Sequence, residues 1–435
     1  MTDCQTLIHA QVVITQNEAR EILNDAGIAI QAGRIAAIGP WTGISAAWNG
    51  AEILDLSGHL VMPGLINSHA HAAMIFLRGL ADDEPLMDWL TKTVFPAEAR
   101  LTPGIVRLGS LLGYAEMLAT GTTACVDMYI FEEAALEAAE IAGIRCLGGE
   151  AVFGAPSAAC ASFEAALEKT AELAERYRDH ERIGLAVNPH SVYTTDAGIL
   201  AGARQLALDL DLPLHIHLAE TPTESAICQE RHGMRPVAWC HENGLLDTRM
   251  IAAHLVDVTR EEAELLGAKG VCGAHNPSSN MKLASGACPA EMLAASGVRL
   301  GIGTDGPASN NQLSMFAEMS RAALLAKAVR RDPAAMPAGM ALDFATLGGA
   351  AVFGDPLLGR LAPGANADLI ALDLSRPNLL PLHNPVSQVV YAASGHEVRL
   401  TMIGGEVVYR DGEFARFDYA DLLKEIAALK EFAQK

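Results

Sequence analysis

The feature that most constrains the fold is a repeated alternation of short apolar segments with helix-like segments between residues 60 and 305. The apolar segments have the length of buried strands and cover residues 60–68, 121–128, 144–150, 182–189, 213–219, 250–255, 270–275 and 298–304. Amphipathic or alanine-rich stretches such as PGIVRLGSLLGYAEMLATG, FEAALEKTAELAERYRD and EEAELLGAKG lie between them. This many β/α units is what a closed parallel barrel requires, so we predict an α/β fold with a (β/α)8 TIM barrel. An open doubly wound sheet is the alternative, but no G-x-G-x-x-G follows any of these strands.

The two ends of the chain have a different pattern. The N-terminal stretches TLIHAQVVIT, AGIAIQAGRIAAIG and AEILDLSGHLVM and the C-terminal stretches ADLIALDL and VRLTMIGGEVVYRDGEF are typical of short strands with hairpin turns. Two β-rich ends that flank a different middle predict a small β-sandwich domain formed from both termini. We therefore assign residues 1–60 and 360–435 to the sandwich and residues 61–359 to the barrel.

Composition and charge argue against several classes of partner. The chain has 435 residues, is 50% hydrophobic and carries a formal net charge of -21, so its surface repels phosphate backbones and anionic headgroups. The N-terminal residues lack the pattern of a secretory signal, and no run is long and apolar enough to span a bilayer. The scattered cysteines form no C-x-x-C pair, which favours reduced thiols. We therefore expect a cytoplasmic protein with neither nucleic acid nor membrane as a partner.

Polar side chains stand at the ends of the predicted strands, where a β/α barrel builds its active site. His69 and His71 end the first strand, and because residues two apart on a strand share a face, they present two imidazoles together. His217 ends the fifth strand and Asp305 ends the eighth. Further strands end at Asp127, His190, His254 and His275. Three imidazoles and one carboxylate suit zinc, so we predict that His69, His71, His217 and Asp305 bind one metal ion.

Each of these residues also has an ordinary structural explanation when it is considered alone. The histidine pair could be hydrogen-bonded at a strand end, and Asp305 could form an Asx turn or a helix N-cap. His215 lies on the same face as His217 and competes for the ligand role, although His217 is closer to the strand end. A second metal would need a bridging ligand such as a modified lysine. Between the first-strand histidines and His217 the only lysines are Lys92 and Lys169, in helix-like or loop context.

Hydrolysis also needs a group that moves protons. Glu220 lies three residues beyond His217 and can reach the substrate side without being a ligand, so we predict it as the catalytic acid-base group. The alternative is a solvated loop carboxylate. His254, at the end of MIAAHLV, is interpreted as a functional histidine rather than a hydrogen-bonded core residue.

The chain resembles the amidohydrolase superfamily in five stretches, namely PGLINSHAHAAMIFLRGLADDEPLMDWL, HSVYT, HIHLAET, NPSSNMKLASG and GTDGPASNN. Within that superfamily it is similar to the 5-methylthioadenosine/S-adenosylhomocysteine deaminases and related chlorohydrolases. The resemblance implies one Zn²⁺ per subunit, or another divalent transition metal such as Fe²⁺, on the four residues predicted above. It also implies that Glu220 is a proton shuttle, that Asp305 takes a proton from water, and that His254 orients or activates at the metal. Substrate contacts are implied for Glu98, His190, Glu220 and Asp305.

The same resemblance implies a reaction and a set of substrates. We expect conversion of the 6-amino group of an adenine nucleoside to the inosine analogue with release of ammonia, on 5-methylthioadenosine, S-adenosylhomocysteine, adenosine or 5'-deoxyadenosine. The alternatives are an s-triazine or other chlorohydrolase, a guanine-like amidohydrolase and a metal-free barrel scaffold. Family members often hold the outer end of the nucleoside with arginines after the third strand. Residues 146–169 contain no arginine and offer Glu150 instead, so the chain departs from the family where the end of a homocysteine-bearing substrate would be held. A homo-oligomer is left open.

Overall fold

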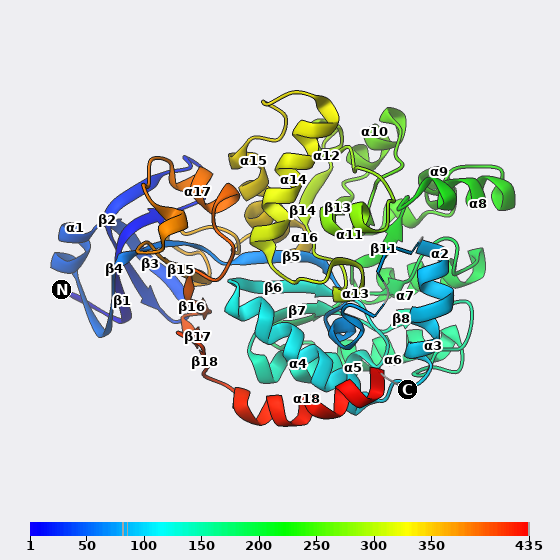
Figure 1. Ribbon diagram of the computed structural model, residues 1–435, viewed down its shortest axis with the longest axis horizontal. Coiled ribbons are helices and arrows are strands. Elements are labelled where there is room, and N and C mark those ends of the chain that lie inside the picture. The colour runs from blue at the N-terminus through cyan, green and yellow to red at the C-terminus, as the bar shows by residue number, and fades with distance from the viewer. Residues whose placement is uncertain (81, 85, 434–435) are drawn as a thin grey trace.

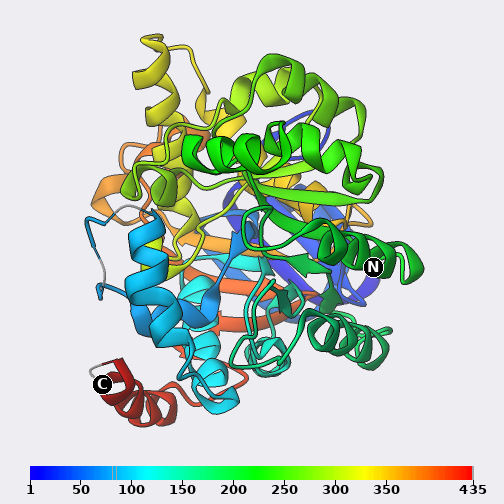
Figure 2. The ribbon, with the colours of Figure 1, turned by 90° about the vertical axis from the view of Figure 1, so that its right-hand side faces the viewer.

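The computed structural model describes residues 1–80, 82–84 and 86–433, with side chains described as far as residue 427. A large sheet lies at one end of the molecule, and beside it parallel strands lie at the centre of a layer of helices (Figures 1 and 2). Within the described chain, no helix combines the length and the apolar character needed to cross a bilayer.

The large sheet is built from both ends of the chain, as predicted. Its strands are β1 (Thr2–Ile14), β2 (Ile22–Gln31), β3 (Arg34–Pro40), β4 (Trp48–Pro63), β15 (Leu369–Asp373), β16 (Val398–Ile403), β17 (Glu406–Arg410) and β18 (Glu413–Phe414). In the described residues the order is β18-β17-β16-β15-β4-β1-β2-β3, so the two ends meet where β4 pairs antiparallel with β15. Side chains of β1 alternate, because Val13 packs inside the sheet cluster whereas Val12 and Ile14 pack into the core shared with the barrel.

Two parallel four-stranded sheets form the barrel. Their strands are β5 (Leu65–Ala70), β6 (Thr122–Asp127), β7 (Arg145–Gly148) and β9 (Ile183–Leu185), then β11 (Leu214–Leu218), β12 (Met250–His254), β13 (Cys272–His275) and β14 (Arg299–Ile302). Backbone hydrogen bonds join the sheets at both edges: the His215 N–H donates to the Val187 carbonyl, and the Asp305 N–H donates to the His69 carbonyl, each at 2.9 Å. The described strands thus form the predicted TIM-type ring. The first predicted strand began too early, because residues 60–63 belong to β4 of the terminal sheet.

Helices follow the barrel strands and cover them, whereas α1 packs on β2 and β3 of the terminal sheet. Their bounds are α1 (Trp41–Ala47), η1 (Ala72–Leu77), α2 (Leu86–Asp88), η2 (Trp89–Val94), α3 (Phe95–Glu98), α4 (Pro103–Ala119), α5 (Glu132–Ala142), α6 (Phe163–Arg176), α7 (Ala197–Asp209), α8 (Pro222–His232), α9 (Pro236–Glu242), η3 (Leu245–Asp247), α10 (Arg260–Ala268), α11 (Pro277–Lys282), α12 (Ala290–Ala295), α13 (Pro307–Asn310), α14 (Met315–Arg330), α15 (Ala338–Asp343), η4 (Phe344–Gly348), α16 (Gly349–Phe353), η5 (Pro377–Leu379), α17 (Pro385–Tyr391) and α18 (Tyr419–Ala433). Two strands of two residues, β8 (Ala151–Val152) and β10 (Asn188–Pro189), pair with each other. The predicted helical stretches begin at local caps: Thr102 caps α4, Ser162 caps α6, and Thr259 forms a capping box with Glu262 at α10.

The C-terminal segment contacts the barrel as well as the terminal sheet. α17 packs against α14 and α15, and α18 packs against α4. The boundary between residues 359 and 360 therefore stays a prediction, because segments beyond it contribute to both parts of the molecule.

Candidate active site

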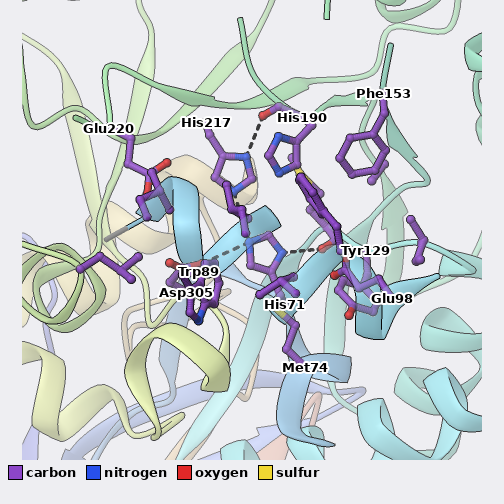
Figure 3. A pocket seen from close by; sticks show the side chains of 18 of the residues that line it. His71, Met74, Trp89, Glu98, Tyr129, Phe153, His190, His217, Glu220 and Asp305 are labelled. Carbon is purple, nitrogen blue, oxygen red and sulfur yellow. Dashed lines mark hydrogen bonds and ion pairs between the residues drawn. The ribbon is translucent and has the colours of Figure 1, made fainter. Parts of the chain in front are cut away.

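Histidine and aspartate side chains meet beyond the carboxyl ends of the barrel strands (Figure 3). The Nε2 atom of His71 lies 3.2 Å from Nε2 of His217 and 3.1 Å from Oδ1 of Asp305. The Nε2 atom of His69 lies 3.4 Å from the same carboxylate oxygen. The structure therefore brings together the four residues that the sequence indicated as ligands, although they are far apart in the chain.

This cluster has the donor set of a divalent transition-metal site. His69, His217, His254 and Asp305 each offer a ligand atom, and these atoms all lie within 4.8 Å of one another. Among the described residues the buried Nε2 atom of His254 has no hydrogen-bond partner, and that of His69 has only the Asp305 carboxylate at 3.4 Å, whereas buried polar atoms are normally satisfied. Imidazole nitrogens and a carboxylate oxygen suit zinc and its neighbours, so the residues fit a metal ion.

The outer ring nitrogens of His69, His71 and His217 have their own partners. Their Nδ1 atoms lie 2.9, 2.6 and 2.7 Å from, respectively, the His215 ring Nε2, the Met128 carbonyl and the His190 carbonyl. The two carbonyls can only accept, so Nδ1 of His71 and of His217 donates and Nε2 is the nitrogen that faces the cluster. His215 lies behind His69, whereas His217 reaches the cluster itself.

Asp127, at the end of β6, supports the His71 side of the cluster. Its Oδ1 accepts hydrogen bonds from the backbone N–H of Ala72 at 3.1 Å and of Met128 at 3.0 Å. The Tyr114 hydroxyl donates to its Oδ2 at 2.7 Å. Asp127 thereby fixes the Met128 residue whose carbonyl accepts from His71.

Asp305 is oriented by two serines that were not singled out in the sequence. Its Oδ2 accepts from Ser279 Oγ at 2.5 Å and from Ser309 Oγ at 2.9 Å, which leaves Oδ1 for the imidazoles. Both serines lie inside recognised stretches, NPSSNMKLASG and GTDGPASNN, but serine itself carries no signal for this role. Asp305 and His254 have backbone φ angles of 60° and 75°, and non-glycine residues in this left-handed region occur often at functional sites.

Burial and the Asp305 carboxylate control the protonation of the cluster. Burial lowers the pKa of His69 to about 4 and holds the pKa of His217 well below its ordinary value. Burial acts to raise the pKa of Asp305, but hydrogen bonds with His69 and His71 hold it well below the ordinary range. Burial opposes protonation of His71 too, yet Asp305 raises the pKa of His71 to about 9. A metal ligand must be unprotonated, so metal binding displaces this proton.

Glu220 lies just beyond β11 with its carboxylate beside the cluster (Figure 3). Its Oε1 lies 4.0 Å from Nε2 of His254, whose Nδ1 lies 2.8 Å from Oδ1 of Asn280. Glu224 holds the backbone of this loop, because its carboxylate accepts from the N–H groups of Ala219 and Glu220 at 3.1 and 2.6 Å. Burial raises the pKa of Glu220, and nearby His254 opposes the shift. A carboxyl group that keeps its proton to higher pH is suited to general acid-base chemistry.

A pocket opens next to the cluster, and His71, His190, His217, Glu220, His254 and Asp305 line it on the side of the cluster. Glu98 and Tyr129 line the side away from Glu220 (Figure 3). Burial raises the pKa of Glu98 to about 7, and the Tyr129 hydroxyl opposes the shift. Trp89, Met74 and Phe153 line the pocket but were not predicted, because large apolar residues in a sequence usually indicate core.

Other chemistry-bearing residues of the sequence lie away from this pocket. His275 lines a separate cavity beside α12 and α14. Glu150 accepts hydrogen bonds from the N–H groups of Phe131 and Glu132 and lines a third cavity, so it does not face the pocket as a substitute for the arginines. The two lysines considered as bridging ligands form ion pairs elsewhere, Lys92 with Asp88 and Lys169 with Glu172.

Comparisons with known proteins agree with this geometry. The sequence pattern of the amidohydrolase family matches residues 60–408. A protein of Desulfovibrio desulfuricans named 5-methylthioadenosine/S-adenosylhomocysteine deaminase is 55% identical over 435 residues, which is 100% of this chain and 99% of the relative. A protein of Lawsonia intracellularis with the same name is 52% identical and covers 99% of this chain and 98% of its own.

Two solved structures with bound zinc have the same fold. One, described as an adenosine deaminase from Xanthomonas campestris, has a TM-score of 0.97 and 37% identity and covers 100% of this chain and 99% of its own. The other, described as an atrazine chlorohydrolase from Arthrobacter aurescens, has a TM-score of 0.90 and 24% identity and covers 98% of this chain and 100% of its own. At that identity the second likeness concerns the fold alone.

Proposed function

This chain belongs to the amidohydrolase family, and we propose that it is a metal-dependent deaminase of adenine nucleosides related to 5-methylthioadenosine. The observation that carries the proposal is the buried Glu220 carboxyl group beside a histidine-aspartate cluster, where both line one pocket. The names of the full-length relatives support the choice of a purine nucleoside over other amines.

We propose that His69, His71, His217 and Asp305 hold one Zn²⁺, with Fe²⁺ as the alternative. When bound, such an ion acts as a Lewis acid and lowers the pKa of water toward neutrality. We propose a single ion because Lys92 and Lys169, the lysines considered as bridging ligands for a second ion, form ion pairs away from the cluster. His254 contributes a nitrogen to the same group, and we assign it to orienting the attacking water because Asn280 holds its ring.

In the proposed reaction, water and the 6-amino nucleoside give the 6-oxo nucleoside and ammonia. Asp305 Oδ1 accepts a proton from the attacking water, and this proton reaches the departing amine. The Glu220 carboxyl group delivers a proton to the ring nitrogen next to the amine-bearing carbon and recovers one from the same water. The two protons of water therefore end on the ring nitrogen and on ammonia, so atoms and charges balance.

We assign substrate positioning to Glu98 and His190. The Glu98 carboxylate can accept hydrogen bonds from sugar hydroxyls, and it lines the pocket on the side away from Glu220. The His190 ring centroid lies 4.6 Å from that of His217 and 4.8 Å from that of Phe153, so it forms a wall between the cluster and the apolar end. A cytoplasmic location and the absence of nucleic-acid partners stay predictions.

The test is a substrate panel on purified protein of known metal content. Ammonia release and ultraviolet absorbance are followed with 5-methylthioadenosine, adenosine, guanine and an s-triazine chloride. We expect a divalent transition metal near one per chain and deamination of the adenine nucleosides. Dechlorination of the triazine without deamination would favour the chlorohydrolase alternative. Protein that holds no transition metal and gains no deaminase activity with added zinc would refute the enzymatic proposal.

A further inference from the structure

The pocket adjoins a second cavity at the end away from Glu220. Pocket and cavity share Phe95, Glu98, Ile130 and Phe153 among the described residues, and Ala99 with residues 155–158 completes the second cavity. We call this second cavity the outer chamber.

The proposed reaction dictates which end of the substrate reaches the outer chamber. The amine-bearing carbon must lie beside Glu220 and Asp305, because both exchange protons with the reacting atoms. In an adenine nucleoside the sugar is attached at the far side of the purine, so the sugar lies toward Glu98 and Phe153 (Figure 3). The group on the sugar 5' carbon then extends into the outer chamber.

The walls of the outer chamber are suited to an uncharged group. No lysine or arginine is among the described residues that line it, and Glu98 is its only acidic residue. The remaining described lining residues are apolar apart from Ser157, whose Oγ already accepts from the N–H groups of Ala159 and Cys160. Apolar walls stabilise a thioether or methyl group by contact alone, whereas a carboxylate gains affinity only from a cation or from hydrogen-bond donors.

We infer that the outer chamber selects adenine nucleosides with an uncharged, apolar 5' substituent, such as an alkylthio or deoxy group, over nucleosides that carry an amino acid there. The inference rests on the proposed function and narrows its substrate class. The names of the relatives contain substrates with both kinds of 5' group, whereas we infer that this chain prefers one kind.

The first test compares 5-methylthioadenosine, 5'-deoxyadenosine and S-adenosylhomocysteine as substrates and as ligands. We expect kcat/KM for S-adenosylhomocysteine to be about tenfold or more below that for 5-methylthioadenosine, because its charged end finds no cation. Equal or higher kcat/KM for S-adenosylhomocysteine overturns the inference but leaves the deaminase proposal intact. Calorimetric Kd values for the same ligands test the chamber independently of turnover, so loss of deamination alone refutes only the proposed function.

The second test adds the missing cation. Ala155 and Ala158 line the chamber and are exposed, so each can accept a longer side chain. We expect Ala155→Arg or Ala158→Arg to raise the S-adenosylhomocysteine to 5-methylthioadenosine ratio of kcat/KM about threefold or more, the effect of a partly screened ion pair. Ala155→Gln adds similar length without charge and should not raise the ratio. An unchanged ratio in both arginine variants, with unaltered thermal unfolding, overturns the placement of the 5' group.

Discussion

Replacement of Glu220 by glutamine separates proton transfer from metal binding. Glu220 is 4% exposed, and the loop is held through its backbone N–H, which donates to Glu224. Glutamine has nearly the same shape and leaves that bond intact, so folding should change little. Its amide cannot donate and recover a proton, and loss of a positioned acid-base group costs on the order of a hundredfold to ten-thousandfold in rate. The Glu220 carboxylate lies 4.0 Å from His254 Nε2, so its replacement breaks no close ion pair.

The assay is kcat for deamination of 5-methylthioadenosine, followed by ultraviolet absorbance, together with metal analysis of the same preparation. We expect Glu220→Gln to keep its metal and its unfolding temperature while kcat falls about a hundredfold or more. Glu230→Gln is the matched control. Glu230 lies exposed on the following helix α8 and does not line the pocket, so this substitution removes the same charge away from the site.

Two results would refute this reasoning. Turnover of Glu220→Gln within about tenfold of the parent would show that another group transfers the proton. Loss of the metal in Glu220→Gln, with the control unaffected, would instead make Glu220 a ligand.

Three further predictions concern the metal, its support and a buried carboxyl group. Chelation should abolish deamination and lower the free energy of unfolding by about 3 kcal/mol at a hundredfold excess of metal over Kd, both reversed by zinc; unchanged unfolding would argue against a bound ion. Asp127→Asn should weaken metal affinity about tenfold to a hundredfold in chelator competition, because the amide nitrogen that replaces Oδ2 cannot accept from the Tyr114 hydroxyl and the side chain is no longer held; unaltered affinity would remove Asp127 from the support of His71. Burial raises the pKa of Glu98 from 4.5 to about 7, so its stabilising contribution is complete below pH 4.5 and is lost as pH rises through 7. Between pH 6 and 8 the free energy of unfolding of Glu98→Gln, measured with denaturant, should therefore fall by about 1 kcal/mol less than that of the parent. Parallel pH profiles of the two proteins would contradict this prediction.

The barrel strands were predictable because a parallel strand that is covered on both faces is a short, uninterrupted apolar run. The largest boundary error lies at residues 60–63, where β4 of the terminal sheet is followed almost at once by β5. Both strands are buried there, so composition does not separate them. The break at Gly64 is visible only once β4 is seen to pair with β15.

Side-chain direction was less predictable than strand position. His217 and His275 both end barrel strands, yet His217 faces the pocket and His275 faces a cavity beside α12. Glu150 follows β7 and turns to cap backbone N–H groups of α5 instead of facing the substrate. Strand parity allows either face, and the choice depends on register and on the loop that follows.

The sequence by itself determined the element order, the sheet from both termini and the histidines and carboxylates that stand at strand ends, because periodicity and residue chemistry are local properties. Only the tertiary structure decided which of these residues meet, which nitrogen each histidine presents, and which carboxyl groups are buried enough to hold a proton. It also decided that apolar residues from α3, the loop after β6 and the segment after β8 line an outer chamber that has no cation among its described residues. Such properties depend on distances between segments far apart in the chain, and these distances exist only after the barrel has closed.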